Sequence, residues 1–418
     1  MFGAGGPRVK ARIKVGAVND VYVIDALRSP IGRYGGVLAN ARPDDLAGHV
    51  IAAAVERNSL APESVDEIYM GCTNQAGEDN RNVARMAALL AGLPVEVPGQ
   101  TVNRLCGSGL QAVATAAHAI KAGEGATFIA GGVESMTRAP YVQLKAAEPW
   151  SRRAPDVADT TVGWRFVNPR LKKEWTIALG ETAEVVAERY KISRAEQDAF
   201  SAESQRRAAQ ALESCVFTDE LVPVPLGDGK TFDRDEYPRP DTTAQKLAAL
   251  KPAFRKDGTV TAGSSSGIND GAAALLITAA PPGRTETDGD GRGRTRPLAR
   301  IVASAVAGVD PSVMGLGPIP ATQKALQRAG IKAKDLDWIE LNEAFAAQAI
   351  ACIRDLGLDP AKVNPCGGGI ALGHPLGCTG AKLLVTAVHG LRRTNGRYGL
   401  VTMCIGVGQG IALIVERA

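Results

Sequence analysis

The sequence predicts an α/β protein made of two similar halves, with a loop-rich insertion inside the first half. Short runs rich in Val and Ile, typical of buried strands, alternate with longer segments of helical periodicity. Three of the four Trp residues and many charges interrupt this pattern between about residues 137 and 258. The predicted units are a disordered extension at 1–17, a first α/β domain at 18–136 and 258–281, the insertion at 137–257, a linker at 282–297 and a second α/β domain at 298–418.

The first half contains strands where β-branched residues run together and helices where small apolar residues recur at helical spacing. Before the insertion, the predicted elements are strand 21–27, helix 45–57, strand 66–72, helix 82–90, helix 110–120 and strand 127–130. Within the insertion, Ser193 and Glu196 form a capping-box pattern that opens a polar helix reaching about residue 214. Strand 272–278 follows the insertion.

The second half repeats this order. Its predicted elements are strand 299–306, helix 321–329, strand 338–341, a helix after 342–345, a turn at 373–380 with a helix after it, and strands 400–404 and 411–415. Cys106 precedes a helix and a strand near Gly131, and Cys378 precedes a helix and a strand near Gly406 at a similar separation. The similarity suggests a duplicated unit with a site between the copies.

Composition excludes several classes of function. The 418 residues carry 48 basic and 44 acidic side chains, a net charge of +4, so nucleic-acid binding is not expected. The chain has no apolar stretch of membrane-spanning length, and no membrane association is expected. Residues 1–17 lack the apolar core of a signal peptide, and the seven cysteines form no CxxC pair. These features predict a reducing, cytoplasmic location.

Cys106 is the first candidate for chemistry. It lies in Asn-Arg-Leu-Cys-Gly-Ser-Gly, directly before an Ala-rich helical segment. A helix N-terminus favours a thiolate, and the glycines at 107 and 109 allow another molecule to approach the backbone closely. The alternative is a buried small hydrophobic residue, which is the interpretation we prefer for Cys72, Cys215 and Cys352.

Two further glycine-rich segments lie near the C-terminus. One is Gly-His-Pro-Leu-Gly around His374, and the other is Met-Cys-Ile-Gly around Cys404. Cys366, His374 and Cys378, with Cys404 as a fourth ligand, could be considered for zinc. Zinc ligands are usually more closely spaced, and the glycines favour approach of a substrate to the backbone, so we predict no metal.

These segments together resemble the motifs of the thiolase family. The family order is matched by 103–109, by Gly-Gly-Val-Glu-Ser-Met at 131–136, by Asn-Glu-Ala-Phe at 342–345, by 373–377 and by 403–406. The resemblance implies two duplicated βαβαβαββ domains with an inserted loop domain. It also implies a homodimer or homotetramer, acyl-CoA and CoA as substrates, and no cofactor.

The resemblance assigns roles to individual residues. Cys106 would be the nucleophile that attacks a 3-oxoacyl-CoA, and His374 would activate it. Cys404 would exchange a proton with the α-carbon of acetyl-CoA. Asn342 would hold a water that forms one oxyanion hole with His374, while the backbone N–H groups of Cys106 and Gly406 would form the other. A covalent acyl-cysteine and two oxyanion holes suit a reaction that passes through charged oxygens.

Contacts with CoA and substrate are carried over in the same way. Ser266 would touch the pantetheine, and Arg239 would lie near the nucleotide; the alternative for Arg239 is a solvated loop charge. Segments 159–169 and 238–243 are similar to those of thiolases that act on 3-oxoadipyl-CoA. Arg165, in the first of them, could bind the terminal carboxylate of that substrate through two hydrogen bonds, although a surface ion pair is the alternative.

Alternatives of function remain open. The chain could be a general 3-ketoacyl-CoA thiolase or an acetyl-CoA C-acetyltransferase acting on acetoacetyl-CoA. A non-catalytic lipid-binding protein of the same fold and a ketosynthase are disfavoured by the two thiols and the Gly-His-Pro segment. Cys366 stands where the family commonly has Asn, which affects the expected geometry of loop 364–369. Ala178 and Leu179 stand where many biosynthetic members have His and Met.

Overall fold

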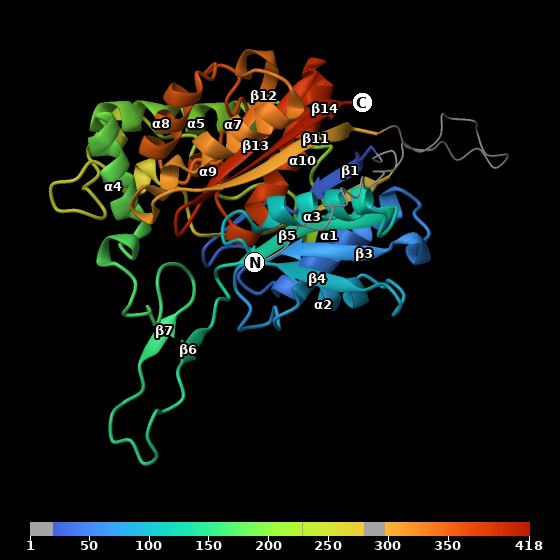
Figure 1. Cartoon of the computed structure of the whole chain (residues 1–418), viewed down its shortest axis with the longest axis horizontal. Helices are drawn as coiled ribbons and strands as arrows, with labels where there is room; N and C mark the ends of the chain where they lie inside the picture. Colours follow the sequence, from blue (N-terminus) through green and yellow to red (C-terminus); the bar gives the residue numbers. More distant parts are fainter. Residues whose placement is uncertain (1–19, 228, 280–296) are drawn as a thin grey trace, which may run out of the picture.

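A single ten-stranded sheet spans the molecule in the computed structural model, which describes residues 20–227, 229–279 and 297–418. Its order is β12-β13-β14-β11-β1-β10-β5-β3-β4, with the short β2 paired to β10. Figure 1 labels most of these strands, from β12 near the top to β4 below. The strands of the first half are β1 (Tyr22–Arg28), β2 (Gly32–Arg33), β3 (Glu67–Gly71), β4 (Gly99–Val102), β5 (Thr127–Ser135) and β10 (Asn269–Thr278). Those of the second half are β11 (Ala299–Gly308), β12 (Leu336–Leu341), β13 (Tyr398–Ile405) and β14 (Gln409–Arg417).

The sheet order confirms the duplication. On either side of the β1–β11 pair, the neighbouring strands are antiparallel: β10 and β5 on one side, β14 and β13 on the other. The next strands, β3 and β12, then run parallel to β5 and β13. Beyond β12, a single parallel bridge between Ile339 and Val363 takes the place that β4 has in the first half. The two halves therefore share one βαβαβαββ plan.

Helices form three layers around the two half-sheets. Helices α3 (Ser108–Ala122) and α10 (Leu376–Thr394) are central and pack against strands of both halves. Helices α1 (Pro43–Arg57) and α2 (Val83–Leu90) cover the other face of the first half, and α7 (Pro318–Ala329) and α8 (Ala346–Leu356) cover that of the second. Because strand side chains alternate between faces, β10 supplies both the central core and the outer one.

The insertion and connecting segments hold the remaining elements. The described helices there are α4 (Leu179–Tyr190), α5 (Arg194–Glu213), α6 (Ala244–Ala248) and α9 (Gly369–Leu372). Strands β6 (Tyr141–Gln143) and β7 (Val157–Asp159) form an arm that extends away from both halves (Figure 1), and β8 (Val224–Gly227) pairs with β9 (Lys230–Phe232). The 3-10 turns are η1 (Pro62–Ser64), η2 (Lys173–Trp175), η3 (Ala262–Ser264), η4 (Pro311–Leu316) and η5 (Ala333–Asp335).

Several boundaries differ from the sequence prediction. Strand 127–130 continues to Ser135 through its pairing with β10. Gly131 and Gly132 lie within it because a Cβ there would collide with the backbone of β10 and of α10. Helix α1 begins two residues earlier than predicted, at Pro43, whose preset φ suits a first helical position. Helix α10 begins inside the predicted turn 373–380, at Leu376.

Other elements were missed or wrongly placed by the prediction. Strand β4 was missed, and the insertion contains α4, which was not predicted. Cys215, predicted to be buried, is exposed just after α5 with φ 53°. The capping box of Ser193 and Glu196 is confirmed at the start of α5. The predicted extension 1–17, and the linker 282–297 except its last residue, lie outside the described residues. No helix in the described ranges is long and apolar enough to cross a membrane.

Candidate active site

One cavity of ≈ 700 Å³ brings most of the predicted site residues together. It is lined, among others, by Cys106, His374, Cys404, Gly406, Ser266 and Arg239. These residues come from the starts of α3 and α10, the end of β13, the segment before β10 and, for Arg239, the loop between β9 and α6 of the insertion. The insertion supplies part of the wall, including Leu179 of α4 and Phe254. The sheet topology thus places the corresponding ends of both halves around one site.

Cys106 is held at the start of α3 by a turn that its neighbours close. Leu105 has the left-handed φ of 47°, and its N–H donates to Asn103 Oδ1 at 2.9 Å. The Ser108 hydroxyl accepts from the N–H of Arg104 at 2.9 Å and donates to the carbonyl of Leu105 at 2.6 Å. The helix itself begins at Ser108, so the thiol lies beside the N-terminal end of α3, as predicted.

Two backbone N–H groups donate hydrogen bonds to the Cys106 sulfur. Burial raises the pKa of this thiol, whereas hydrogen bonds from the N–H groups of Gly406 and of Cys106 itself lower it, with a net upward shift. These are the same two groups that the resemblance to thiolases assigns to an oxyanion hole. Because both approach the sulfur, both can also reach an oxygen on the carbon bound to that sulfur.

His374 is a buried, neutral base. Burial, reinforced by the Lys382 cation, lowers the pKa of the imidazole to about 4. The backbone N–H of His374 donates to Asn269 Oδ1 at 3.0 Å, and Nδ1 lies 2.7 Å from Thr379 Oγ1. Asn342 does not line the cavity, but its Nδ2 lies 3.4 Å from His374 Nε2. The imidazole ring of His374 is therefore held by a polar neighbour at each nitrogen, Thr379 at Nδ1 and Asn342 at Nε2.

The pH dependence of acylation follows from this environment. An ordinary imidazole becomes protonated as the pH falls through about 6.5. Because the pKa of His374 is lowered to about 4, its basic form persists below that value. We expect the rate of acyl-enzyme formation, measured by rapid quench between pH 5 and pH 8, to show no step near 6.5. A decrease centred near pH 6.5 would contradict this assignment of the base.

Cys404 lies in an apolar environment. It is 2% exposed and belongs to a small cluster with Met314, Ala344 and Phe345. Burial raises the pKa of its thiol well above the ordinary value, and the neighbouring Cys106 raises it further. Burial thus makes Cys404 a weaker acid than an ordinary thiol. At neutral pH it holds its proton and can deliver it to a strongly basic carbon.

Glu134 is a structural residue of the site whose function the sequence did not reveal. Its buried carboxylate accepts hydrogen bonds from the backbone N–H groups of Thr73 (3.0 Å), Asn74 (3.1 Å) and Gly377 (2.7 Å). Gly377 belongs to the turn that carries His374. Glu134 thereby connects the end of β5 to that turn, which explains the carboxylate within the Gly-Gly-Val-Glu-Ser-Met segment.

Glu343 has a similar role beside Asn342. It accepts from Ser204 Oγ at 2.7 Å, from Asn364 Nδ2 at 2.8 Å and from the N–H of Ile370 at 3.2 Å. In loop 364–369, Asn364 bonds Glu343 and Leu341, and the Gly368 N–H donates to Ser204 Oγ at 3.1 Å. The Cys366 thiol is buried and, among the described residues, accepts only a long contact from an arginine, at 3.8 Å. Replacement of the usual Asn at position 366 is thus compatible with an ordered loop.

The residues expected to contact CoA lie at another part of the same cavity. Ser266 lines the cavity, and its backbone N–H donates to the carbonyl of Ala344 at 2.9 Å. Arg239 places its guanidinium 5.2 Å from the centre of the Tyr237 ring. Arg165 is exposed and does not line the cavity, although its neighbour Trp164 does, with its indole N–H donating to Ile177 O at 3.1 Å.

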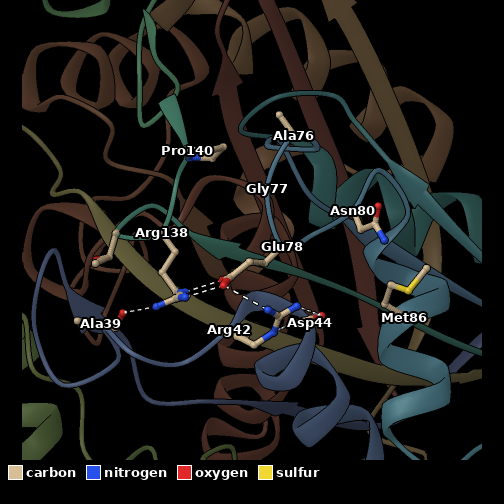
Figure 2. A pocket seen from close by; sticks show the side chains of 11 residues that line it. Ala39, Arg42, Asp44, Ala76, Gly77, Glu78, Asn80, Met86, Arg138 and Pro140 are labelled. Carbon is tan, nitrogen blue, oxygen red and sulfur yellow. Dashed lines mark hydrogen bonds and ion pairs between the residues drawn. The ribbon is translucent and has the colours of Figure 1, made fainter. Parts of the chain in front are cut away.

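A second cavity, of ≈ 530 Å³, contains none of the predicted residues. Figure 2 shows the guanidinium of Arg138 facing the carboxylate of Glu78, with Arg42 and Asp44 beside them. Arg42 bonds both carboxylates, at 3.3 Å to Glu78 and 2.8 Å to Asp44. The two arginines and the two carboxylates of this cavity therefore pair with one another. Within the described parts of the chain, no three His, Cys, Asp or Glu side chains are arranged to hold a metal ion.

A thiol and a neutral imidazole that line one cavity, with two backbone N–H groups bonded to the sulfur, suit acyl transfer through a cysteine thioester. Fold and site therefore define a cysteine-dependent acyltransferase. Within that class the chain belongs to the thiolase family, because residues 21–280 match the thiolase N-terminal domain and residues 295–417 match the thiolase C-terminal domain.

Individual relatives match this chain over nearly its whole length. The 3-oxoadipyl-CoA/3-oxo-5,6-dehydrosuberyl-CoA thiolase of Escherichia coli (strain K12) is 55% identical over 96% of this chain and 100% of its own length. The beta-ketoadipyl-CoA thiolase of Pseudomonas aeruginosa is 53% identical, over 95% and 99%. The crystal structure of human mitochondrial 3-ketoacyl-CoA thiolase in complex with CoA superposes with a TM-score of 0.87 at 39% identity, covering 96% and 98%.

Proposed function

We propose that the protein cleaves 3-oxoadipyl-CoA with CoA to give acetyl-CoA and succinyl-CoA, as part of the breakdown of aromatic compounds. The main support is identity above 50% over nearly the full chain with relatives whose names state that substrate. CoA is a substrate in this proposal, and no cofactor takes part. We also propose that the protein is a homodimer or homotetramer in the cytoplasm. Light scattering on a size-exclusion column tests the oligomeric state.

The first half-reaction would form a succinyl-cysteine. The Cys106 proton moves to His374 Nε2, and the sulfur attacks the C3 carbonyl of the substrate. The N–H groups of Cys106 and Gly406 stabilise the oxygen on that carbon. The C2–C3 bond then breaks, its electron pair goes to C2, and Cys404 protonates C2 to release acetyl-CoA. His374 with a water held by Asn342, whose buried Oδ1 accepts no hydrogen bond from the described residues, would stabilise the enolate oxygen.

The second half-reaction would restore the enzyme. The thiol of CoA gives its proton to the Cys404 thiolate and attacks the succinyl carbonyl on Cys106. The same pair of N–H groups stabilises the oxygen of this second tetrahedral intermediate. As the intermediate collapses, the Cys106 sulfur leaves and takes back the proton that His374 held. Protons and electrons are therefore balanced over the cycle, and neither a metal nor a redox partner is needed.

The choice of substrate is tested by comparing two thioesters. We expect kcat/KM in the thiolytic direction to be higher for 3-oxoadipyl-CoA than for acetoacetyl-CoA. If Arg165 binds the terminal carboxylate, Arg165→Ala should reduce activity about tenfold on 3-oxoadipyl-CoA alone, because one charge-assisted contact at an exposed position is lost. Arg170→Ala, a change of another exposed arginine in the same segment, serves as the control.

Other outcomes of this comparison have different meanings. Equal losses on both substrates in Arg165→Ala would remove Arg165 from recognition of the carboxylate. A wild-type preference for acetoacetyl-CoA would instead support a general thiolase, the second candidate function.

A further inference from the structure

The His374 ring has a different neighbour at each nitrogen. On one side, Nδ1 lies 2.7 Å from the Thr379 hydroxyl oxygen, and on the other, Nε2 faces the amino group of Asn342. An imidazole can act as a base at Nε2 only if its single proton is on Nδ1. The hydrogen bond made by Nδ1 therefore decides whether His374 can activate Cys106.

The hydroxyl of Thr379 has its own hydrogen directed elsewhere. It donates to the carbonyl of Pro375, one turn back along α10, at 2.8 Å. With that hydrogen engaged, the oxygen presents a lone pair to the imidazole, and Nδ1 must be the donor. In the opposite tautomer, Nε2–H would face the N–H groups of Asn342, so two donors would meet.

We infer that Thr379 is a positioning residue that keeps the proton of His374 on Nδ1 and leaves Nε2 as the base for Cys106. This inference rests on the proposed function, because it concerns the same reaction. It assigns a role to a residue that lies outside the catalytic set predicted from the sequence. The contact joins residues only five positions apart, so it is built into the turn that starts α10.

Burial prevents water from replacing the contact between His374 Nδ1 and Thr379 Oγ1. Thr379 is 1% exposed and His374 is 5% exposed, so bulk water cannot supply an alternative acceptor. Leaving a buried N–H without an acceptor is costly, and this cost shifts the tautomer equilibrium toward Nε2–H. The backbone N–H of His374 is bonded separately to Asn269, so loss of the hydroxyl should leave the turn in place.

The hydrogen bond from Nδ1–H to Thr379 Oγ1 is present in both protonation states of the His374 ring. When Nε2 accepts the proton of Cys106, the imidazolium retains its Nδ1–H, which continues to donate to Thr379 Oγ1. When the sulfur leaves later in the cycle, Nε2 returns that proton and the starting tautomer is restored. Thr379 gains and loses no proton at any stage.

Two substitutions at position 379 separate the hydroxyl from the shape of the side chain. Thr379→Val removes the hydroxyl, and Thr379→Ser retains it. Thr386→Val is the matched control, since Thr386 is a buried threonine on the same helix whose hydroxyl bonds Glu220 at 3.2 Å. We expect Thr379→Val to acylate Cys106 from acetyl-CoA on the order of 10²-fold more slowly at pH 7. We expect little change in KM for this variant, and near wild-type rates in the other two variants.

Nitrogen-15 chemical shifts of labelled histidine supply a readout that a purely structural role would not move. Wild type should show a protonated Nδ1 and an unprotonated Nε2 for His374, assigned by the signals lost in His374→Asn. Thr379→Val should show a mixed or reversed pair. An unprotonated Nδ1 in wild type, or wild-type acylation in Thr379→Val, would overturn the inference.

The same measurements separate this inference from the proposed function. A wild-type protein that cleaves no 3-oxoacyl-CoA would count against the function, while its nitrogen-15 spectrum would still report the tautomer. If Thr379→Val does not fold, the wild-type spectrum and the rate of Thr379→Ser still decide the matter.

Discussion

Acetyl-CoA alone should leave one acetyl group on Cys106, and Cys106→Ser should abolish both that adduct and turnover. The expected loss is on the order of 10³-fold or more, because an unactivated hydroxyl is a far poorer nucleophile than a thiol. The lowered pKa of His374 strengthens this expectation, since so weak a base removes a proton from a thiol far more readily than from an alcohol. Intact-mass and peptide-mass analysis after incubation measures the adduct.

A control addresses acetylation outside the site. Cys215 is an exposed thiol remote in sequence from every catalytic motif, so Cys215→Ser should carry the adduct at the same stoichiometry as wild type. Acetylation found only on another cysteine, or on none, would contradict the covalent mechanism. The serine variant should retain the wild-type unfolding temperature, because the replaced side chain is only partly buried and the turn is held by its neighbours.

The sequence predicted those parts of the site that are encoded locally. Cys106 could be identified because the turn, the glycines and the helix that favour a thiolate are all adjacent in the chain. His374 and Cys404 stood out for the same reason, as reactive side chains among glycines. The duplication could be inferred because each half repeats the same order of strands and helices.

The supporting residues could not be predicted, since their contacts are distant in sequence. Glu134 bonds Gly377, which is 243 positions away, and nothing near Glu134 indicates that partner. Strand β4 was missed because its four residues at the sheet edge, Gly99–Val102, have no continuous apolar run. The pKa shift of Cys404 also depends on packing, as Met314 and Phe345 bury the thiol from other segments.

Cys404→Ser should uncouple the two thiols of the site. The variant should still accept an acetyl group on Cys106, whereas exchange of the α-protons of acetyl-CoA with deuterium should slow on the order of 10³-fold. The reason lies in proton affinity. Even with its raised pKa, a buried thiol can become a thiolate and remove a proton from carbon, whereas a serine hydroxyl in the same apolar environment is a much weaker acid.

Cys352 provides the matched control for this experiment. Its thiol is buried near Cys404 and donates to the carbonyl of Gly315 at 3.3 Å, a bond that a serine hydroxyl can keep. Cys352→Ser should therefore exchange α-protons at the wild-type rate. Deuterium incorporation followed by mass spectrometry measures both variants. Wild-type exchange in Cys404→Ser would assign the carbon base to another group of the cavity, such as His374.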